Sequence, residues 1–158
     1  NQDGTSMKEQ WGIVGDTYIV GCKIPDSIVY PEFNAFNPDM DKSKYCTKLG
    51  IYQKSIGLDN VLFSFGHDEY LYQLLKFNNI KLPKVAMHMI RYHSCYLWHT
   101  DEEYKDFENK KDKKYKEKVR AFNKYDLYTK DNKTYDYDEM KKYYNPIVNK
   151  YFNKIIYW

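Results

Sequence analysis

The sequence has few cysteines, no long hydrophobic run and almost no excess of charge, and each absence excludes a class of protein. Its three cysteines, Cys22, Cys46 and Cys95, form no CxxC pair, which argues against a disulfide framework or a thiolate zinc site and fits a reducing cytoplasm. No apolar stretch approaches the ~20 residues of a membrane-spanning helix. The net charge of +3 is too small to indicate a nucleic-acid or membrane partner. We therefore expect a cytoplasmic protein with neither partner.

Aromatic residues are abundant instead: they make up 18% of the chain, and 18 of them are tyrosines. A buried tyrosine keeps its hydroxyl group hydrogen-bonded, so this composition predicts a semi-polar interior or a wet cleft. The 158 residues, 42% of them hydrophobic, are enough for one compact domain spanning 1–158.

The chain divides into three stretches. Residues 1–10 are polar and without periodicity, which predicts a frayed end. Residues 11–58 are rich in turn-forming residues, and the β-prone runs 18–20 and 28–30 predict a small hairpin. Residues 59–158 have helical periodicity. The expected fold class is therefore all-α, with a small irregular or β-hairpin segment near the N-terminus.

Capping residues and prolines predict where the helices begin. Asp59 caps a helix that reaches Phe77, and the helix opened by Pro83 ends near His93. Thr100 and Glu103 have capping-box spacing, which predicts a third helix. The remaining helices are expected over 115–129, from Asp136 and from Pro146. The lysine-dense stretch 110–118 is interpreted as a solvated helix face or linker.

Three polar residues lie in register with apolar positions of these predicted helices, namely His67, His93 and Asp126. Burying a carboxylate among apolar side chains is costly without a partner. Inward side chains on facing helices build the metal sites of helical bundles, so these residues could converge on a metal. Nitrogen and oxygen ligands without thiolate favour iron, manganese or zinc over copper(I).

Simpler interpretations compete with this metal site. A lone histidine on an apolar face is usually a core residue, and Asp126 could pair with Lys124 or Lys130. The adjacent His67 and Asp68 also match the His-Asp pair of HD-domain metal hydrolases, although two-residue matches arise by chance.

The other two histidines are given structural or neutral roles. His88 is placed near Lys84 and Tyr92, off the buried face, and is expected to meet solvent or a loop. His99 precedes the predicted cap at Thr100 and is expected to be structural.

Several long motifs occur in the order found in one family. The sequence GHDEYLYQ starts at Gly66, MIRYHS starts at Met89 and is followed by WHT, and FNKYDLYTK starts at Phe122. Shorter matching runs lie upstream, at 14–17, 20–22, 49–53 and 57–59. Over about 11–158 the chain resembles the myo-inositol oxygenase family. Leu97 departs from the family pattern, which commonly has proline there.

This resemblance implies an all-helical variant of the HD-domain fold that holds two irons and converts myo-inositol and dioxygen to D-glucuronate. By position, His67 and His93 would be the two histidines of one iron, and Asp126 would ligate the other. Asp68 matches a position that is not a ligand, which counts against the hydrolase interpretation.

The resemblance also implies a substrate site. Gly15, Asp16, His93, Ser94 and Lys130 match positions that line the inositol site. Lys130 would act catalytically, because a lysine near a chelated hydroxyl stabilises developing alkoxide charge.

The chain matches only half of the family's metal site. The family's remaining ligands, a histidine and a His-Asp pair with a lysine, have no counterpart before His67. Either upstream helices or a partner chain complete the site, or the chain is an inactive remnant that acts as a binding or structural module. Removal of upstream helices would expose apolar faces around Phe63, Leu74 and Val119.

Overall fold

The computed structural model describes residues 16–126, 134–152 and 155–158, and the chain is mostly helical there. The α-helices are α2 (His67–Phe77), α3 (Lys84–Tyr92), α4 (Tyr96–His99), α5 (Lys110–Asp126) and α6 (Tyr137–Tyr151). Short 3₁₀ helices lie at Pro31–Phe36, Pro38–Asp41, Ser43–Tyr45, Leu58–Asn60 and Glu103–Asp106. The expected all-α class with a small β segment is confirmed.

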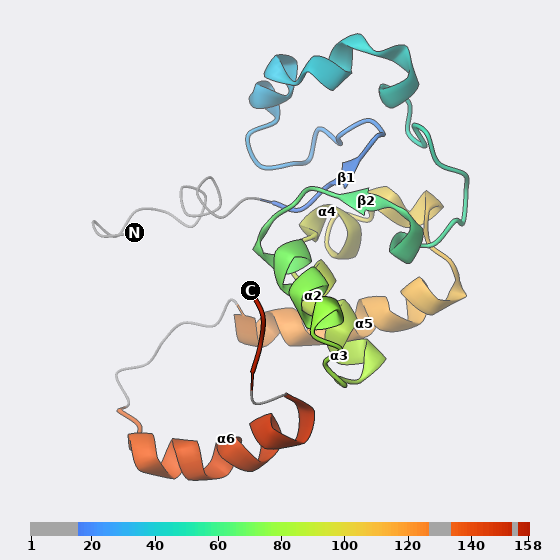
Figure 1. Cartoon of the computed structure of the whole chain (residues 1–158). Coiled ribbons are helices and arrows are strands. Elements are labelled where there is room, and N and C mark those ends of the chain that lie inside the picture. Colours follow the sequence, from blue (N-terminus) through green and yellow to red (C-terminus); the bar gives the residue numbers. More distant parts are fainter. Residues whose placement is uncertain (1–15, 127–133, 153–154) are drawn as a thin grey trace.

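The β segment pairs differently from the prediction. Strand β1 (Ile19–Val20) lies antiparallel to β2 (Leu62–Phe63), so its partner is not the run at 28–30. That run leads into two 3₁₀ helices, each with a proline in its first turn. Proline lacks the N–H group of a strand ladder and presets helical φ, which explains the difference. Figure 1 shows this segment (blue to teal) above the helices.

Two helix starts differ from the prediction. Asp59 does not cap α2, which begins at His67. The Asp59 carboxylate instead accepts hydrogen bonds from the Tyr92 hydroxyl and Lys111. Thr100 ends α4 rather than opening a helix, and its hydroxyl contacts the ring of His99.

The predictions for the C-terminal half are partly confirmed. α5 starts at Lys110 and so includes the lysine-dense stretch. Asp136 caps α6 as predicted, accepting from the N–H group of Glu139 at 2.9 Å. Pro146 lies inside α6 and does not begin a helix.

The core lies between the β segment and α3, α4 and α5. Its largest fully buried side chains include Trp98, Tyr92 and Phe107. The polar tips of two buried aromatic side chains have partners: the Trp98 indole donates to Glu108 at 2.7 Å, and the Tyr104 hydroxyl accepts from the N–H group of Ile19 at 3.2 Å. These contacts are the semi-polar interior that the tyrosine content predicts.

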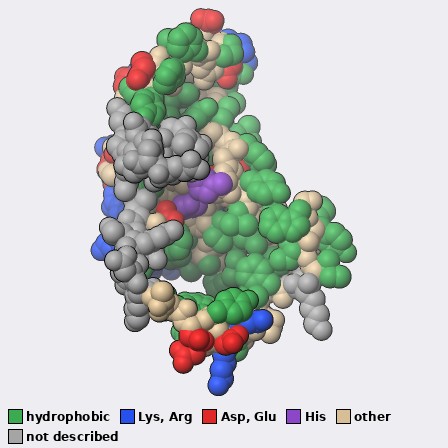
Figure 2. All heavy atoms as spheres, turned by 90° about the vertical axis from the view of Figure 1, so that its left-hand side faces the viewer, with side chains coloured by type: hydrophobic (Ala, Val, Ile, Leu, Met, Phe, Trp, Pro, Cys, Tyr) green, Lys and Arg blue, Asp and Glu red, His purple; other side chains and the backbone are tan. Residues whose placement is uncertain are grey.

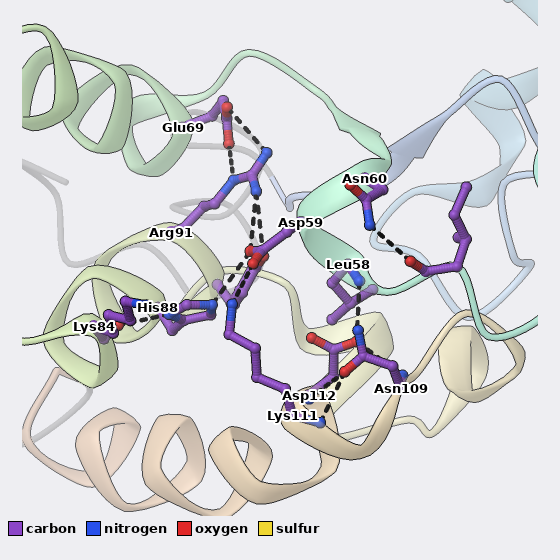
Figure 3. Close-up of polar contacts among 12 residues, drawn as sticks. Leu58, Asp59, Asn60, Glu69, Lys84, His88, Arg91, Asn109, Lys111 and Asp112 are labelled. Carbon is purple, nitrogen blue, oxygen red and sulfur yellow. Dashed lines mark hydrogen bonds and ion pairs between the residues drawn. The ribbon is translucent and has the colours of Figure 1, made fainter.

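A charged network links α2, α3 and α5 on one side of this core (Figure 3). Arg91 donates to Glu69 at 2.6 Å, and His88 Nε2 lies 3.2 Å from an Asp59 carboxylate oxygen. His88 Nδ1 donates to the Lys84 carbonyl at 2.6 Å. His88 is therefore buried, and its predicted place near solvent is wrong. The nearby His88 ring, with the hydrogen bonds of Lys111 and Tyr92, holds the pKa of Asp59 well below the usual range.

Replacing His88 by alanine should therefore destabilise the fold. The substitution removes the packing of the buried His88 ring on the Tyr115 ring, whose centroid lies 4.5 Å away, and it removes the ring nitrogen that lies 3.2 Å from the Asp59 carboxylate. We expect the free energy of unfolding to fall by ~2 kcal/mol, measured by urea denaturation. His67→Ala is the matched control, because His67 is exposed and should cost less than ~1 kcal/mol. Equal costs for both variants would contradict the buried network.

Exposed apolar side chains occur in two regions. Phe63, Leu74 and Val119 are themselves buried, but Leu62, Phe65, Leu71 and Phe77, close in sequence to the first two, are exposed. Helix α6 buries none of its described residues and exposes the apolar side chains of Tyr143, Tyr144, Ile147 and Val148. Figure 1 shows α6 set apart from α2, α3 and α5. Within the ranges that the structure describes, no helix has the length and apolar character needed to cross a membrane.

Candidate functional site

Two histidines from different helices meet at one point. His67 is the first residue of α2, and His93 directly follows α3. Their Nε2 atoms lie 3.0 Å apart, and the two rings are nearly perpendicular. With metal–nitrogen bonds of ~2.1 Å, nitrogens at this separation can bind one metal ion at an angle near ~90°. The separation is compatible with two neighbouring ligands of one ion, and without a metal it is a hydrogen bond between the two rings.

Hydrogen bonds fix the orientation of His93. Its Nδ1 donates to the Ile90 carbonyl at 2.8 Å, so the neutral ring keeps its lone pair on Nε2, the atom that faces His67. Its own carbonyl accepts from Asn123 at 2.8 Å and from His99 at 3.0 Å. A backbone acceptor on the second ring nitrogen is the usual way in which proteins orient a metal-binding histidine.

Ser94 lies beside this pair, and its backbone connects it to the segment that carries Asp16. The Ser94 hydroxyl is 3.2 Å from His67 Nε2, and the Ser94 carbonyl accepts from the N–H group of Thr17 at 3.1 Å, which brings Asp16 to this part of the fold. Asp16 also lines an open cavity of about 540 Å³. Its Oδ1 atom is buried with no hydrogen-bond partner in the described part of the chain. A buried acceptor without a donor is suited to a hydroxyl group of a ligand.

Burial makes the Asp16 carboxyl group an unusually weak acid. Loss of solvent and then the nearby carboxylate of Asp101 raise its pKa to about 7, while backbone groups of Val29, Tyr96 and Thr17 act in the opposite direction. Near neutral pH the group is therefore able both to accept and to release a proton.

The raised pKa predicts that Asp16 lowers the stability of the folded protein in a pH-dependent way. An unfolded aspartate titrates near ~3.9, so between about pH 4 and 7 the folded state retains a proton that the unfolded state has released. Stability therefore falls as pH rises through this window. Asp16→Asn should raise the free energy of unfolding by roughly 1–2 kcal/mol at pH ~8 and hardly change it at pH ~4, measured by thermal denaturation.

Asp26→Asn serves as the control for that pH dependence, since Asp26 is exposed and, among the described residues, pairs with Lys23 alone. A gain for Asp26→Asn equal to that for Asp16→Asn would show that the effect is one of net charge.

Comparison with known proteins agrees with this geometry. The sequence profile described as myo-inositol oxygenase matches residues 5–158. The chain belongs to the myo-inositol oxygenase family. It is 46% identical over 151 residues to the inositol oxygenase of Homo sapiens, covering 94% of this chain and 53% of that protein. Similar matches are found to the inositol oxygenase of Dictyostelium discoideum (45% over 149 residues) and inositol oxygenase 1 of Arabidopsis thaliana (44% over 149 residues), each covering 94% of this chain. The chain spans about half the length of these curated relatives, 51% and 48% of the last two.

The family's third expected ligand in this chain lies apart from the histidine pair. His67 and Asp126 are both exposed, which is contrary to the inward faces predicted for them. The predicted inward face of His67 depended on Phe63, which lies in β2 and not in the same helix. Asp126 is the last residue of α5. Among the described residues, no group of three or more histidine, cysteine, aspartate or glutamate side chains could hold a metal. Figure 2 shows histidine side chains open to one face, bordered by hydrophobic side chains.

Two predicted site residues are not described by the structure, and two residues that contact the site were not predicted from the sequence. Gly15 and Lys130, expected in the substrate site, lie outside the described residues. Conversely, sequence reasoning missed Thr17 and Asn123, which contact the backbone of Ser94 and His93. Both residues lie in runs that match the family, Thr17 in 14–17 and Asn123 in the FNKYDLYTK motif, and these runs were the available signals.

Proposed function

We propose that this chain is the part of an inositol oxygenase that supplies two histidine ligands to one iron of a diiron site. The reaction is the oxidation of myo-inositol by dioxygen to D-glucuronate in the cytoplasm. One observation carries the proposal: two histidine Nε2 atoms lie 3.0 Å apart, in a chain that belongs to the oxygenase family. The donor set fits iron, because it offers nitrogen and oxygen atoms and no thiolate.

Each candidate residue has a defined part in this proposal. His67 and His93 would hold iron, and Asp126 would ligate the second iron of the pair. When bound, iron supplies Lewis acidity toward adjacent hydroxyl groups and redox chemistry with dioxygen. The unpartnered Oδ1 of Asp16 accepts a hydrogen bond from an inositol hydroxyl group, and the Ser94 hydroxyl orients another.

Two further residues extend the substrate site. Gly15 would line it next to Asp16, and the Lys130 ammonium group would stabilise the alkoxide that develops on the substrate. The other ligands would come from helices upstream of this chain or from a partner chain. They would include a carboxylate that this chain lacks.

A second candidate function is a binding or structural module without catalysis. The observation that favours it is that no three ligand side chains gather among the described residues. A chain of this kind would retain the family fold and would bind another protein without catalysing a reaction.

The two functions are separated by comparing this chain with the complete gene product, each loaded with iron. We expect the complete protein to consume dioxygen with myo-inositol and to form glucuronate. The chain alone should bind iron weakly and form none, because at most three ligands remain. Two or more tightly bound irons in the chain alone, by elemental analysis, would show that the ligands are misassigned. A complete protein that binds other proteins yet never forms glucuronate would establish the second function.

A further inference from the structure

A buried hydrogen bond joins the segment before β1 to the first turn of α2. The Thr17 hydroxyl donates to Asp68 Oδ2 at 2.7 Å, although the two residues are 51 positions apart. Thr17 is 2% exposed and Asp68 is fully buried. A charged acceptor and a short distance make this a strong hydrogen bond, and burial shields it from competing water.

Thr17 also bonds to a third segment. Its backbone N–H group donates to the carbonyl of Ser94, 3.1 Å away, just after α3. One residue thus connects three separate stretches of the chain. Each stretch carries a candidate site residue directly beside the bond: Asp16 precedes Thr17, His67 precedes Asp68, and His93 precedes Ser94.

The surroundings of Asp68 are built for this bond. Its other oxygen, Oδ1, accepts from the N–H group of Glu69 at 2.8 Å, within the first turn of α2. Gly66, the N-cap residue of α2, provides no side-chain cap. A Cβ atom at Gly66 would lie only 3.1 Å from Asp68 Oδ1 and 3.8 Å from the Thr17 hydroxyl oxygen. Any larger residue there would press on the carboxylate.

We propose that Thr17 and Asp68 are positioning residues, whose hydrogen bond sets the separation of the His67 and His93 rings and fixes the segment that carries Asp16. This inference rests on the proposed function, because it assigns a purpose to that separation. Neither residue is expected to touch metal or substrate. They act by fixing the three backbone segments from which the site residues project.

The chain offers a matched control for a buried aspartate at a helix start. Asp112 is 1% exposed and accepts backbone N–H groups of Leu58 at 3.0 Å and Asn109 at 2.9 Å (Figure 3). Within the described residues, none of its hydrogen bonds involves a candidate site residue. Both Asp112→Asn and Asp68→Asn remove a buried carboxylate charge at a helix start, but Asp112 Oδ1 has no hydrogen-bond partner among the described residues, whereas both Asp68 oxygens have one. Only Asp68→Asn disturbs the proposed site.

The test uses Co²⁺ alone as the probe and follows its visible absorption on titration into the complete gene product. Thr17→Val, Asp68→Asn and Gly66→Ala should each weaken Co²⁺ binding by ~10–100-fold, the range for loss of a group that orients a metal ligand. Thr17→Ser, which keeps the hydroxyl group, should restore binding to within ~2-fold of wild type. Asp112→Asn should leave Co²⁺ affinity unchanged even where it lowers the melting temperature.

Hydrogen exchange gives a second measurement that needs no metal. Thr17→Val should speed amide exchange ~10-fold or more in peptides spanning 64–70 and 92–96, and not in 108–116. Unchanged exchange in the first two peptides, or equal effects of Asp112→Asn on Co²⁺ binding, would overturn the proposal. The complete protein could fail to form glucuronate while exchange and Co²⁺ binding change as expected. Thr17 and Asp68 would then be positioning residues of a site that carries out another reaction.

Discussion

Replacing His93 by alanine in the complete protein is expected to abolish glucuronate formation. The substitution removes an Nε2 atom that faces His67 at 3.0 Å and is oriented by the Ile90 carbonyl. Loss of a direct ligand should exceed the ~10–100-fold effect of losing an outer-shell partner. The measurement is glucuronate yield and dioxygen consumption per folded protein, together with bound iron by elemental analysis.

His88→Ala is the control for this loss, because His88 lies in the charged network and not in the histidine pair. It should lower stability while the folded protein keeps its turnover and iron. An active His93→Ala enzyme with unchanged iron would remove His93 from the ligand set.

Two companion variants separate ligation from substrate handling. Asp126→Asn should lower both iron content and turnover, because the amide is a neutral and poorer ligand. Lys130→Ala should weaken substrate handling and leave iron content intact, since the residue would carry charge without ligating. Wild-type iron and yield in Asp126→Asn would contradict the role that family membership gives that residue.

The fold was predictable where the signal is local. The Asp136 cap and the Pro83 turn mark helix starts through contacts within a few residues, and α6 and α3 begin as predicted. Prediction was wrong where a distant partner competes for the same group. Asp59 could cap a helix, but Lys111 and Tyr92 engage its carboxylate across 52 and 33 positions of sequence.

The candidate site shows the same division. Family motifs placed His67 and His93 in one site, and the structure brings their rings together. Helix periodicity could not tell that His67 is exposed, because the register used for it crossed from β2 into α2. Periodicity also could not indicate Thr17, whose partners Asp68 and Ser94 are defined only by the tertiary arrangement.

The largest loss of stability is expected from Arg91→Met. Arg91 and Glu69 are both buried, and their charged groups meet at 2.6 Å and 3.3 Å. Methionine retains much of the apolar stem that packs near the Tyr72 ring but leaves the Glu69 carboxylate without its cation. An uncompensated buried charge costs ~3–5 kcal/mol. Urea denaturation should show this fall in the free energy of unfolding.

The double variant Glu69→Gln with Arg91→Met distinguishes a lost charge pair from lost packing. It removes the unpaired carboxylate while the amide can still accept from Gln73, which lies 2.5 Å from Glu69 Oε1. Most of the lost stability should return, because an apolar or neutral replacement of a buried pair is often nearly neutral. If the double variant is as unstable as Arg91→Met, the guanidinium contributes through its stacking on Phe63, Tyr72 and Tyr92 and the ion pair adds little.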